Sequence, residues 1–141
     1  MENSLLISMY RDFFLSLRCQ YSEGKLNLAK PLLLLAMLRL IDNGSVKNNV
    51  FSFEIIQKEY NQLQKGYNVK APCHYPVYYM DSEEFYHLKW NKDVIKVRVP
   101  STKFIRNNIL YAYFDNALWE LLQEDQIREN FTSSIINFYL K

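Results

Sequence analysis

Residues 30–44 read KPLLLLAMLRLIDNG, a Pro, four consecutive leucines and a closing Gly within one helix length. Pro31 suits the first turn of a helix, where its missing N–H costs nothing, and Gly44 suits the stop after the last turn. The pattern therefore predicts a helix from about residue 29 to residue 42. Because its apolar side chains cover nearly the whole circumference, other elements must surround it. We expect this segment to be the central buried helix.

The segments on either side of this helix predict more helices. Apolar residues recur at mostly helical spacing from residue 4 to about residue 19, which indicates an amphipathic first helix. Val50-Phe51 is suited to a short strand, and Ser52 is suited to capping a third helix over about residues 53–65. Asp125 is expected to start a last amphipathic helix.

The region after residue 65 has a different pattern. Pro72 and Pro76 indicate a loop over residues 66–76, because proline disfavours helical geometry in the residue before it. Short segments rich in Val, Ile, Tyr and Phe follow, and they predict a hairpin or small meander formed by residues 77–80, 84–90 and 94–99. We therefore expect an α+β fold: a mainly helical single domain over residues 1–141, with a central buried helix and a small antiparallel sheet or hairpin.

The stretch after the expected meander contains two further capping signals. Ser101 is expected to cap a short helix that runs to about residue 106, and Asp115 a helix over residues 117–122. Between them, residues 110–114 are suited to an extended connection.

Composition restricts the class of protein. The chain has 141 residues, of which 49% are hydrophobic, with only 3 Gly and 4 Pro, as is usual for one folded domain. The apolar run over residues 31–38 ends at Arg39, far short of the roughly 20 residues that a membrane span needs. The acidic N-terminus does not fit a secretion signal. We expect a cytoplasmic protein that does not enter a membrane, with Cys19 and Cys73 reduced rather than paired.

The net charge of +2 is distributed unevenly along the chain. Residues 25–106 carry thirteen basic and seven acidic side chains, whereas residues 107–141 carry two basic and five acidic ones. Clustered positive charge is the electrostatic footprint of nucleic-acid binding, and a solvated basic face is the alternative. The candidate phosphate-binding residues are Lys89, Lys96, Arg98 and Lys103.

Catalytic and metal-binding patterns are weak. A zinc site would have to combine the two cysteines with His74 and His87, but no C-x-x-C spacing is present. We expect no catalytic activity, no metal and no cofactor. A nuclease with an unrecognised site, using an acidic residue such as Glu23 or Asp81, is the enzymatic alternative.

Aromatic residues gather beside the basic segment, in APCHYPVYYMDSEEFYHLKW, residues 71–90. Aromatic and proline rings offer flat, weakly hydrated surfaces against which sugars and bases can rest. We expect Phe85 and Trp90 to belong to the core, and Tyr75, Pro76 and Tyr78 to be exposed.

Four elements of the sequence, in order, resemble the DNA sulfur-binding domain, which commonly forms the N-terminal part of HNH-type, modification-dependent restriction endonucleases. They span about residues 28–140: KPLLLLAMLRLIDNG, Asn49-Val50-Phe51 before a helix, His74-Tyr75-Pro76, and AYFDNALWELLQEDQIRENFTSSIINFYL. The chain departs from many relatives at Ala29, where they have His, and at Val77, where they often have Phe.

The resemblance implies a reader of duplex DNA whose backbone carries a phosphorothioate, a sulfur in place of one non-bridging oxygen. Tyr75 and Pro76 would form the shallow apolar pocket for sulfur, next to His74, and Lys30 would lie near the DNA. Tyr78 and Tyr79 would either build this pocket or fill it.

No nuclease domain follows residue 141 in this sequence, so the resemblance implies a reader that recruits a separate nuclease subunit or acts as a regulator. The alternative is a protein-interaction subunit of a restriction or defence system, without specificity for sulfur.

Overall fold

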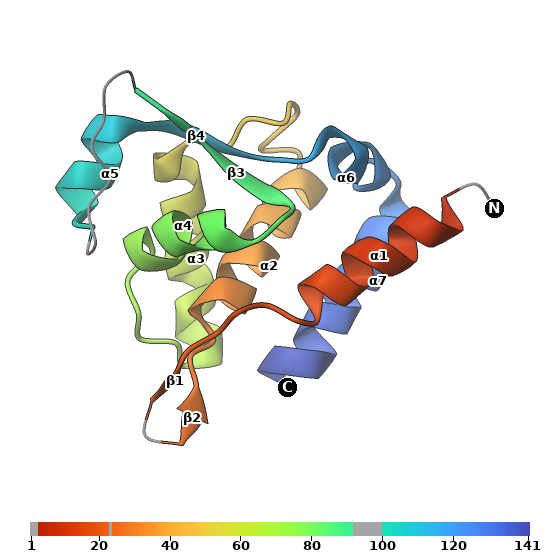
Figure 1. Cartoon of the computed structure of the whole chain (residues 1–141), viewed down its shortest axis with the longest axis horizontal. Coiled ribbons are helices and arrows are strands. Elements are labelled where there is room, and N and C mark those ends of the chain that lie inside the picture. Colours follow the sequence, from red (N-terminus) through yellow and green to blue (C-terminus); the bar gives the residue numbers. More distant parts are fainter. Residues whose placement is uncertain (1–2, 23, 92–99) are drawn as a thin grey trace.

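The computed structural model describes residues 3–22, 24–91 and 100–141. In these residues, helices enclose one central helix, and an antiparallel pair of strands lies across one side of them (Figure 1). The predicted α+β class, mainly helical with a small antiparallel sheet, is confirmed. None of the helices among the described residues combines the length and the hydrophobicity that a membrane span requires.

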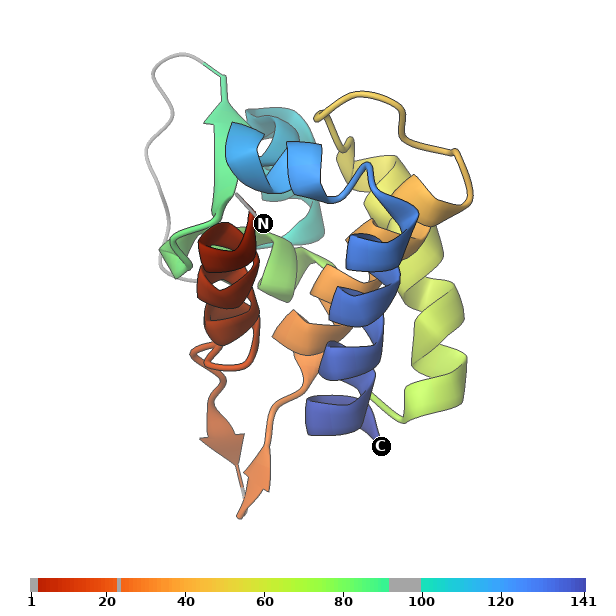
Figure 2. The ribbon, with the colours of Figure 1, turned by 90° about the vertical axis from the view of Figure 1, so that its right-hand side faces the viewer.

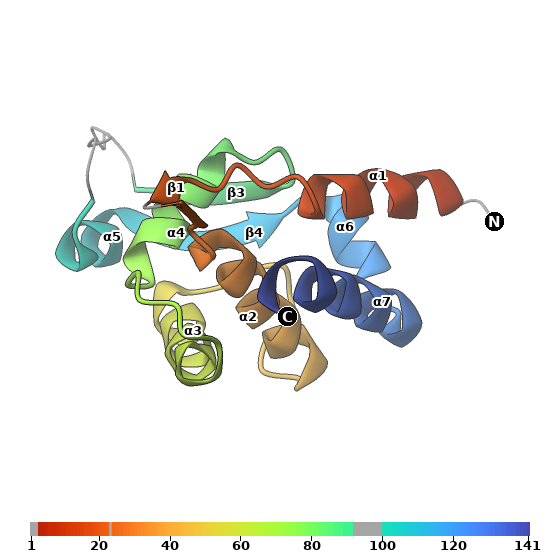
Figure 3. The same cartoon turned by 90° about the horizontal axis from the view of Figure 1, so that it is seen from below.

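The central helix, α2 (Ala29–Asp42), has the predicted bounds. Pro31 is its third residue, and Gly44 follows its end with a positive φ of 78°, a conformation that favours glycine. At its start, Oδ1 of Asn27 accepts a hydrogen bond from the backbone N–H of Ala29. Its side chains are almost all buried, and Figure 3 shows α2 with α3 (Phe53–Tyr67) on one side and α7 (Asp125–Ile135) on the other.

The first helix, α1 (Ser4–Phe14), is shorter than predicted. The Ser16 hydroxyl donates to the carbonyl of Asp12, a side-chain bond that competes with helical backbone bonding, and the chain then leaves the helix. It forms a small hairpin from β1 (Tyr21–Ser22) and β2 (Lys25–Leu26), which projects from the helical body in Figure 2.

The sheet differs from the predicted meander. Its two strands, β3 (Tyr86–Trp90) and β4 (Ile109–Phe114), pair antiparallel with Tyr86 opposite Phe114. The strand expected near residues 84–90 is therefore present, but its partner is the segment predicted as a plain connection. The third expected strand, residues 94–99, lies outside the described residues. Phe51 of the predicted short strand forms only an isolated bridge, to Ala112.

The prediction of a loop up to residue 76 and a strand over residues 77–80 is wrong. Residues His74–Tyr79 form α4, and Met80–Ser82 continue as a 3-10 turn, η1. Pro76 is the third residue of α4, where the backbone N–H would have no helical partner, so proline is tolerated there.

Two of the three side-chain caps predicted from Ser52, Ser101 and Asp115 are confirmed. Ser52 Oγ accepts from the Ile55 N–H at the start of α3, and Ser101 Oγ accepts from the Phe104 N–H at the start of α5 (Thr102–Asn108). Asp115 makes no side-chain cap on α6 (Asn116–Leu121).

The Asp115 carboxylate is directed elsewhere, which explains the missing cap. It accepts from the Tyr10 hydroxyl at 2.9 Å and lies 2.5 Å from His87 Nε2, so it ties α6 to α1 and β3. Helix α7 starts at Asp125 as predicted and continues as a π-helical turn, η2 (Ile136–Leu140).

Candidate functional site

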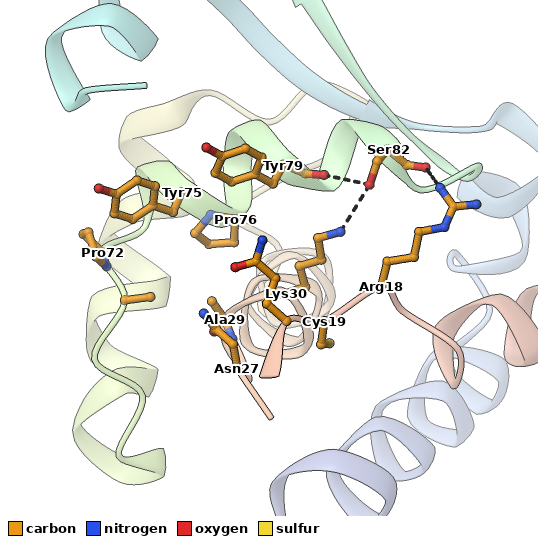
Figure 4. Close-up of a pocket in the computed structure, with 12 residues that line it drawn as sticks. Arg18, Cys19, Asn27, Ala29, Lys30, Pro72, Tyr75, Pro76, Tyr79 and Ser82 are labelled. Carbon is orange, nitrogen blue, oxygen red and sulfur yellow. Dashed lines mark hydrogen bonds between the residues drawn. The ribbon is translucent and has the colours of Figure 1, made fainter. Parts of the chain in front are cut away.

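An open pocket lies where the first turn of α2 meets α4 (Figure 4). Its volume is about 880 Å³. Three segments enclose it: the chain between α1 and α2, the start of α2, and the stretch from the loop before α4 to η1. The lining residues are Arg18, Cys19, Gln20, Asn27, Ala29, Lys30, Ala71, Pro72, Tyr75, Pro76, Tyr79 and Ser82.

One wall of the pocket is aromatic. Helix α4 places Tyr75 and Tyr79 one turn apart, with ring planes 14° from parallel and centroids 6.3 Å apart, and Figure 4 shows Pro76 beside them. Tyr79 is 41% exposed, whereas Tyr75, predicted to be exposed, is partly buried. Pro76 is buried, so its predicted exposure is wrong: the helical turn directs its ring towards α2 rather than into solvent. The helix thus supplies a flat, weakly hydrated surface.

Tyr78 does not line the pocket, because the helical period directs it to another face of α4. Its ring packs edge-on against Trp90 at 5.9 Å and against Phe104 at 6.3 Å. The predicted exposure of Tyr78 is therefore wrong, since the side chain is partly buried between α4, β3 and α5. Trp90 is also partly buried and Phe85 fully buried, in agreement with their predicted place in the core.

His74 lies behind the aromatic wall and does not line the pocket. Its ring centroid is 4.4 Å from that of Tyr75, and its Nδ1 is 2.9 Å from Thr102 Oγ1 on α5. Burial lowers the pKa of this imidazole from 6.5, so the ring is neutral at pH 7. The geometry gives His74 a supporting role for Tyr75.

Lys30 brings positive charge to the pocket. It is the second residue of α2, and its ammonium lies 2.8 Å from Glu83 Oε2 and 3.2 Å from Ser82 Oγ. The Lys30 side chain is only 12% exposed. An ammonium group has three donors, so within the described residues two of them are used and one is left for a ligand in the pocket.

The buried carboxylate of Glu83 accepts hydrogen bonds from the chain after α1 and from the start of α2. Glu83 is 7% exposed, and its Oε2 also accepts from the Arg18 N–H at 3.0 Å. The Arg18 guanidinium donates to the Ser82 carbonyl at 2.8 Å, and the Ser82 hydroxyl donates to the Tyr79 carbonyl at 3.0 Å. Sequence reasoning did not single out Glu83 or Arg18, because the contacts that define them join residues more than 50 positions apart.

Cys19 adds a neutral thiol to the pocket. Burial raises its pKa to about 11, against the opposing effect of the nearby Lys30 charge. The thiol is therefore protonated at pH 7. Both cysteines are free, and no cluster of three or more His, Cys, Asp or Glu able to hold a metal occurs among the described residues.

The predicted phosphate-binding residues do not gather at the pocket. Lys89 on β3 and Lys103 on α5 are exposed, and neither lines it. Lys96 and Arg98 lie outside the described residues, as does Glu23 of the enzymatic alternative.

Comparison with known protein families finds no family model that matches this chain, and a search of curated proteins finds none similar to it. The pocket combines an aromatic wall, a neutral thiol, the Lys30 ammonium, which Glu83 partly neutralises, and the Arg18 guanidinium. This combination suits a ligand that is anionic on one side and weakly hydrated on the other.

Proposed function

We propose that the protein binds duplex DNA carrying a phosphorothioate linkage, and that this pocket receives the modified group. The observation that carries the proposal is the meeting of the Tyr75, Pro76 and Tyr79 surface with the Lys30 ammonium in one open pocket. The sequence resemblance to the DNA sulfur-binding domain supports the same function.

The physical basis is the difference between sulfur and oxygen. Sulfur is larger, softer and less strongly hydrated than oxygen. Moving it from water to a surface of tyrosine and proline rings therefore costs little hydration free energy. An ordinary phosphate oxygen in the same position would lose its water without gaining an equivalent hydrogen bond, which carries a free-energy penalty. Selectivity can therefore arise from desolvation alone, without a chemical step.

Exposed cations outside the pocket are suited to holding the rest of the DNA backbone. Lys103 and Lys89 are exposed on neighbouring elements, α5 and β3, and basic side chains at such positions contribute sequence-independent affinity that falls with salt. We propose that Lys96 and Arg98 join them on phosphates. In this proposal the protein recognises DNA in the cytoplasm without cleaving it, and a separate nuclease subunit acts on the bound site.

The test is fluorescence anisotropy on matched short duplexes with and without one phosphorothioate per strand, at two salt concentrations. We expect tighter binding to the sulfur duplex and a roughly tenfold loss of that preference in Tyr75→Ala, since one aromatic contact to a nucleotide is worth about 1–3 kcal/mol. Tyr111→Ala is the matched control, because Tyr111 is a partly buried tyrosine on β4 that does not line the pocket.

Two results would contradict the proposal. Equal affinity for the two duplexes, lost with added salt, would leave only general DNA binding. A sulfur preference that Tyr75→Ala and Tyr111→Ala reduce equally would place the sulfur site elsewhere.

A second candidate function is that of a protein-interaction subunit of a restriction or defence system. Leu5 and Met9 favour it, because they lie one turn apart on α1 and are 85% and 40% exposed. Exposed apolar residues in one row on a helix suit a protein partner. In the same experiment this function predicts weak DNA affinity without any sulfur preference.

A further inference from the structure

We propose that Glu83 determines the specificity of the pocket, by holding the Lys30 ammonium so that an ordinary phosphate gains too little from it to bind well. This inference rests on the proposed function and adds to it a residue that lies behind the pocket rather than in its lining.

In this geometry Glu83 competes with the ligand for the Lys30 ammonium. Its carboxylate and the phosphate diester are both monoanions that accept hydrogen bonds, and Lys30 Nζ already donates to Glu83 Oε2 at 2.8 Å. Both side chains are largely buried, at 12% and 7% exposure, so their attraction is less screened than that of a surface pair. The bond from the Arg18 N–H fixes the same carboxylate oxygen in place. Two donors from separate segments thus hold the Glu83 carboxylate beside Lys30.

This competition affects the two possible ligands unequally. The oxygen of an ordinary phosphate is strongly hydrated and needs a strong donor to replace its water. A Lys30 ammonium shared with Glu83 and Ser82 offers it one donor and little net charge. Sulfur loses less hydration and is stabilised by the Tyr75 and Pro76 surface, so it depends less on that donor. A neutralised lysine consequently widens the gap between the two ligands.

The direct test is Glu83→Gln, measured on the sulfur and oxygen duplexes. Glutamine keeps the shape of the side chain, and its amide oxygen can still accept from the Arg18 N–H, but the negative charge is gone. We expect affinity for the oxygen duplex to rise roughly tenfold, as a charge-assisted hydrogen bond to phosphate becomes available. Affinity for the sulfur duplex should rise only about twofold on the same argument, so the preference falls about fivefold.

Glu84→Gln is the matched control. Glu84 is the next residue, it is exposed, and its replacement changes the net charge by the same amount. Long-range attraction between protein and DNA therefore changes similarly in both variants, and only Glu83→Gln alters the partner of Lys30. We expect Glu84→Gln to leave the sulfur preference unchanged.

A double-mutant cycle tests whether Glu83 acts through Lys30. In a Lys30→Gln background, Glu83→Gln should no longer alter the ratio of the two affinities, because there is no ammonium to release. Thermal unfolding of each variant, compared with the wild type, shows that the proteins assayed are folded.

The outcomes separate this inference from the proposed function. If the wild type prefers sulfur and Glu83→Gln changes both affinities by the same factor, the inference is wrong and the proposed function stands. The inference is also wrong, with the proposed function intact, if Glu83→Gln and Glu84→Gln behave alike. If the wild type shows no preference for sulfur, the proposed function fails and this inference fails with it.

Discussion

A largely buried cation lies at each end of α2, Lys30 of α2 itself at the N-terminal end and Arg128 of α7 at the C-terminal end, but the two are used differently. At the C-terminal end, the Arg128 guanidinium donates to Asp42 at 3.0 and 3.1 Å, to Asp125 at 2.7 Å and to the Leu122 carbonyl at 2.8 Å. At the N-terminal end, Lys30 donates to one carboxylate and one hydroxyl and borders an open pocket.

The surroundings of the two cations differ as well. The pocket beside Arg128 has a volume of about 630 Å³ and is lined mostly by charged and polar side chains, without an aromatic residue. The pocket beside Lys30 has the Tyr75 and Tyr79 wall. Among the described residues Arg128 uses four of its five N–H donors and Lys30 two of its three, so each cation has one donor left. The difference lies in the surroundings: only the donor of Lys30 stands beside a weakly hydrated wall, which suits it to a ligand.

The largest effect that tests this comparison is on stability, in Arg128→Met. We expect the free energy of unfolding to fall by about 2 kcal/mol, because the hydrogen bonds are lost and the Leu122 carbonyl loses its partner. This loss of stability is near the low end of the range for breaking a buried ion pair, because the Asp42 and Asp125 carboxylates are exposed and remain hydrated. Chemical denaturation measures the change.

The control for Arg128→Met is Lys58→Met, which removes a cation on α3 and should change stability by less than about 0.5 kcal/mol. Folded Arg128→Met should keep the wild-type preference for sulfur duplexes. A loss of that preference at full folding would show that the C-terminal end also takes part in binding.

An effect of intermediate size is expected at the N-terminal end of α2, in Lys30→Gln. Affinity for both duplexes should fall roughly fivefold, because the Glu83 carboxylate is then left beside the bound backbone without its cation. The dependence of log affinity on log salt should become shallower by less than about 0.9, the change for one full phosphate contact, because Glu83 already neutralises much of the Lys30 charge. Stability should fall by only about 1 kcal/mol, because the glutamine amide can still donate to Glu83 although the compensating charge is lost. Anisotropy titrations over a salt series and denaturation measure the two quantities.

Lys103→Gln sharpens the Lys30 experiment. Lys103 is exposed on α5, so its replacement should weaken DNA binding through the loss of a phosphate contact without lowering stability. If Lys30→Gln lowered stability but left DNA binding unchanged, both ends of α2 would be structural, and the proposed contrast between them would be wrong.

The same two regions show what the sequence could predict. Pro31 and Pro76 are each the third residue of a helix. Beside Pro31, a long apolar run and Gly44 mark the helix clearly, and the predicted bounds of α2 are right. Around Pro76 the helix is six residues long and follows Pro72, so the prolines indicate a loop. A local pattern identifies a long buried helix and fails for a short one whose stability comes from tertiary packing.

The pairing of β3 with β4 and the contact between Lys30 and Glu83 could not be predicted, for a related reason. The sequence predicts a connection in place of strand β4 because its partner, β3, precedes it by a whole helix, and pairing across such a distance leaves no local signal. Glu83 stands beside the similar Glu84 in the sequence, yet one is buried against Lys30 and the other is exposed. The resemblance predicts Tyr75 and Pro76 as pocket residues, and the structure places both in a pocket lining with Lys30.

The smallest effect concerns pH at the pocket end and arises from His74. Burial lowers the pKa of its imidazole, so the folded state favours the neutral ring while the unfolded chain protonates near the ordinary value of about 6.5. Between these two pKa values the unfolded state binds more protons, so stability is full above the unfolded pKa and falls as pH decreases through that window. The folded protein should therefore lose stability from pH 7 towards pH 5, and His74→Gln should show a shallower slope over the same range, measured by denaturation at several pH values.

Comparing slopes rather than single stabilities removes the constant cost of losing the contacts that His74 makes with Thr102 and Tyr75. Because Arg128 does not titrate in this range, Arg128→Met should keep the wild-type slope. An unchanged slope in His74→Gln would mean that the wall behind Tyr75 tolerates a charged imidazole. The aromatic side of the pocket would then be more polar than its contacts indicate, and the contrast between the two ends of α2 would be smaller than their hydrogen bonds suggest.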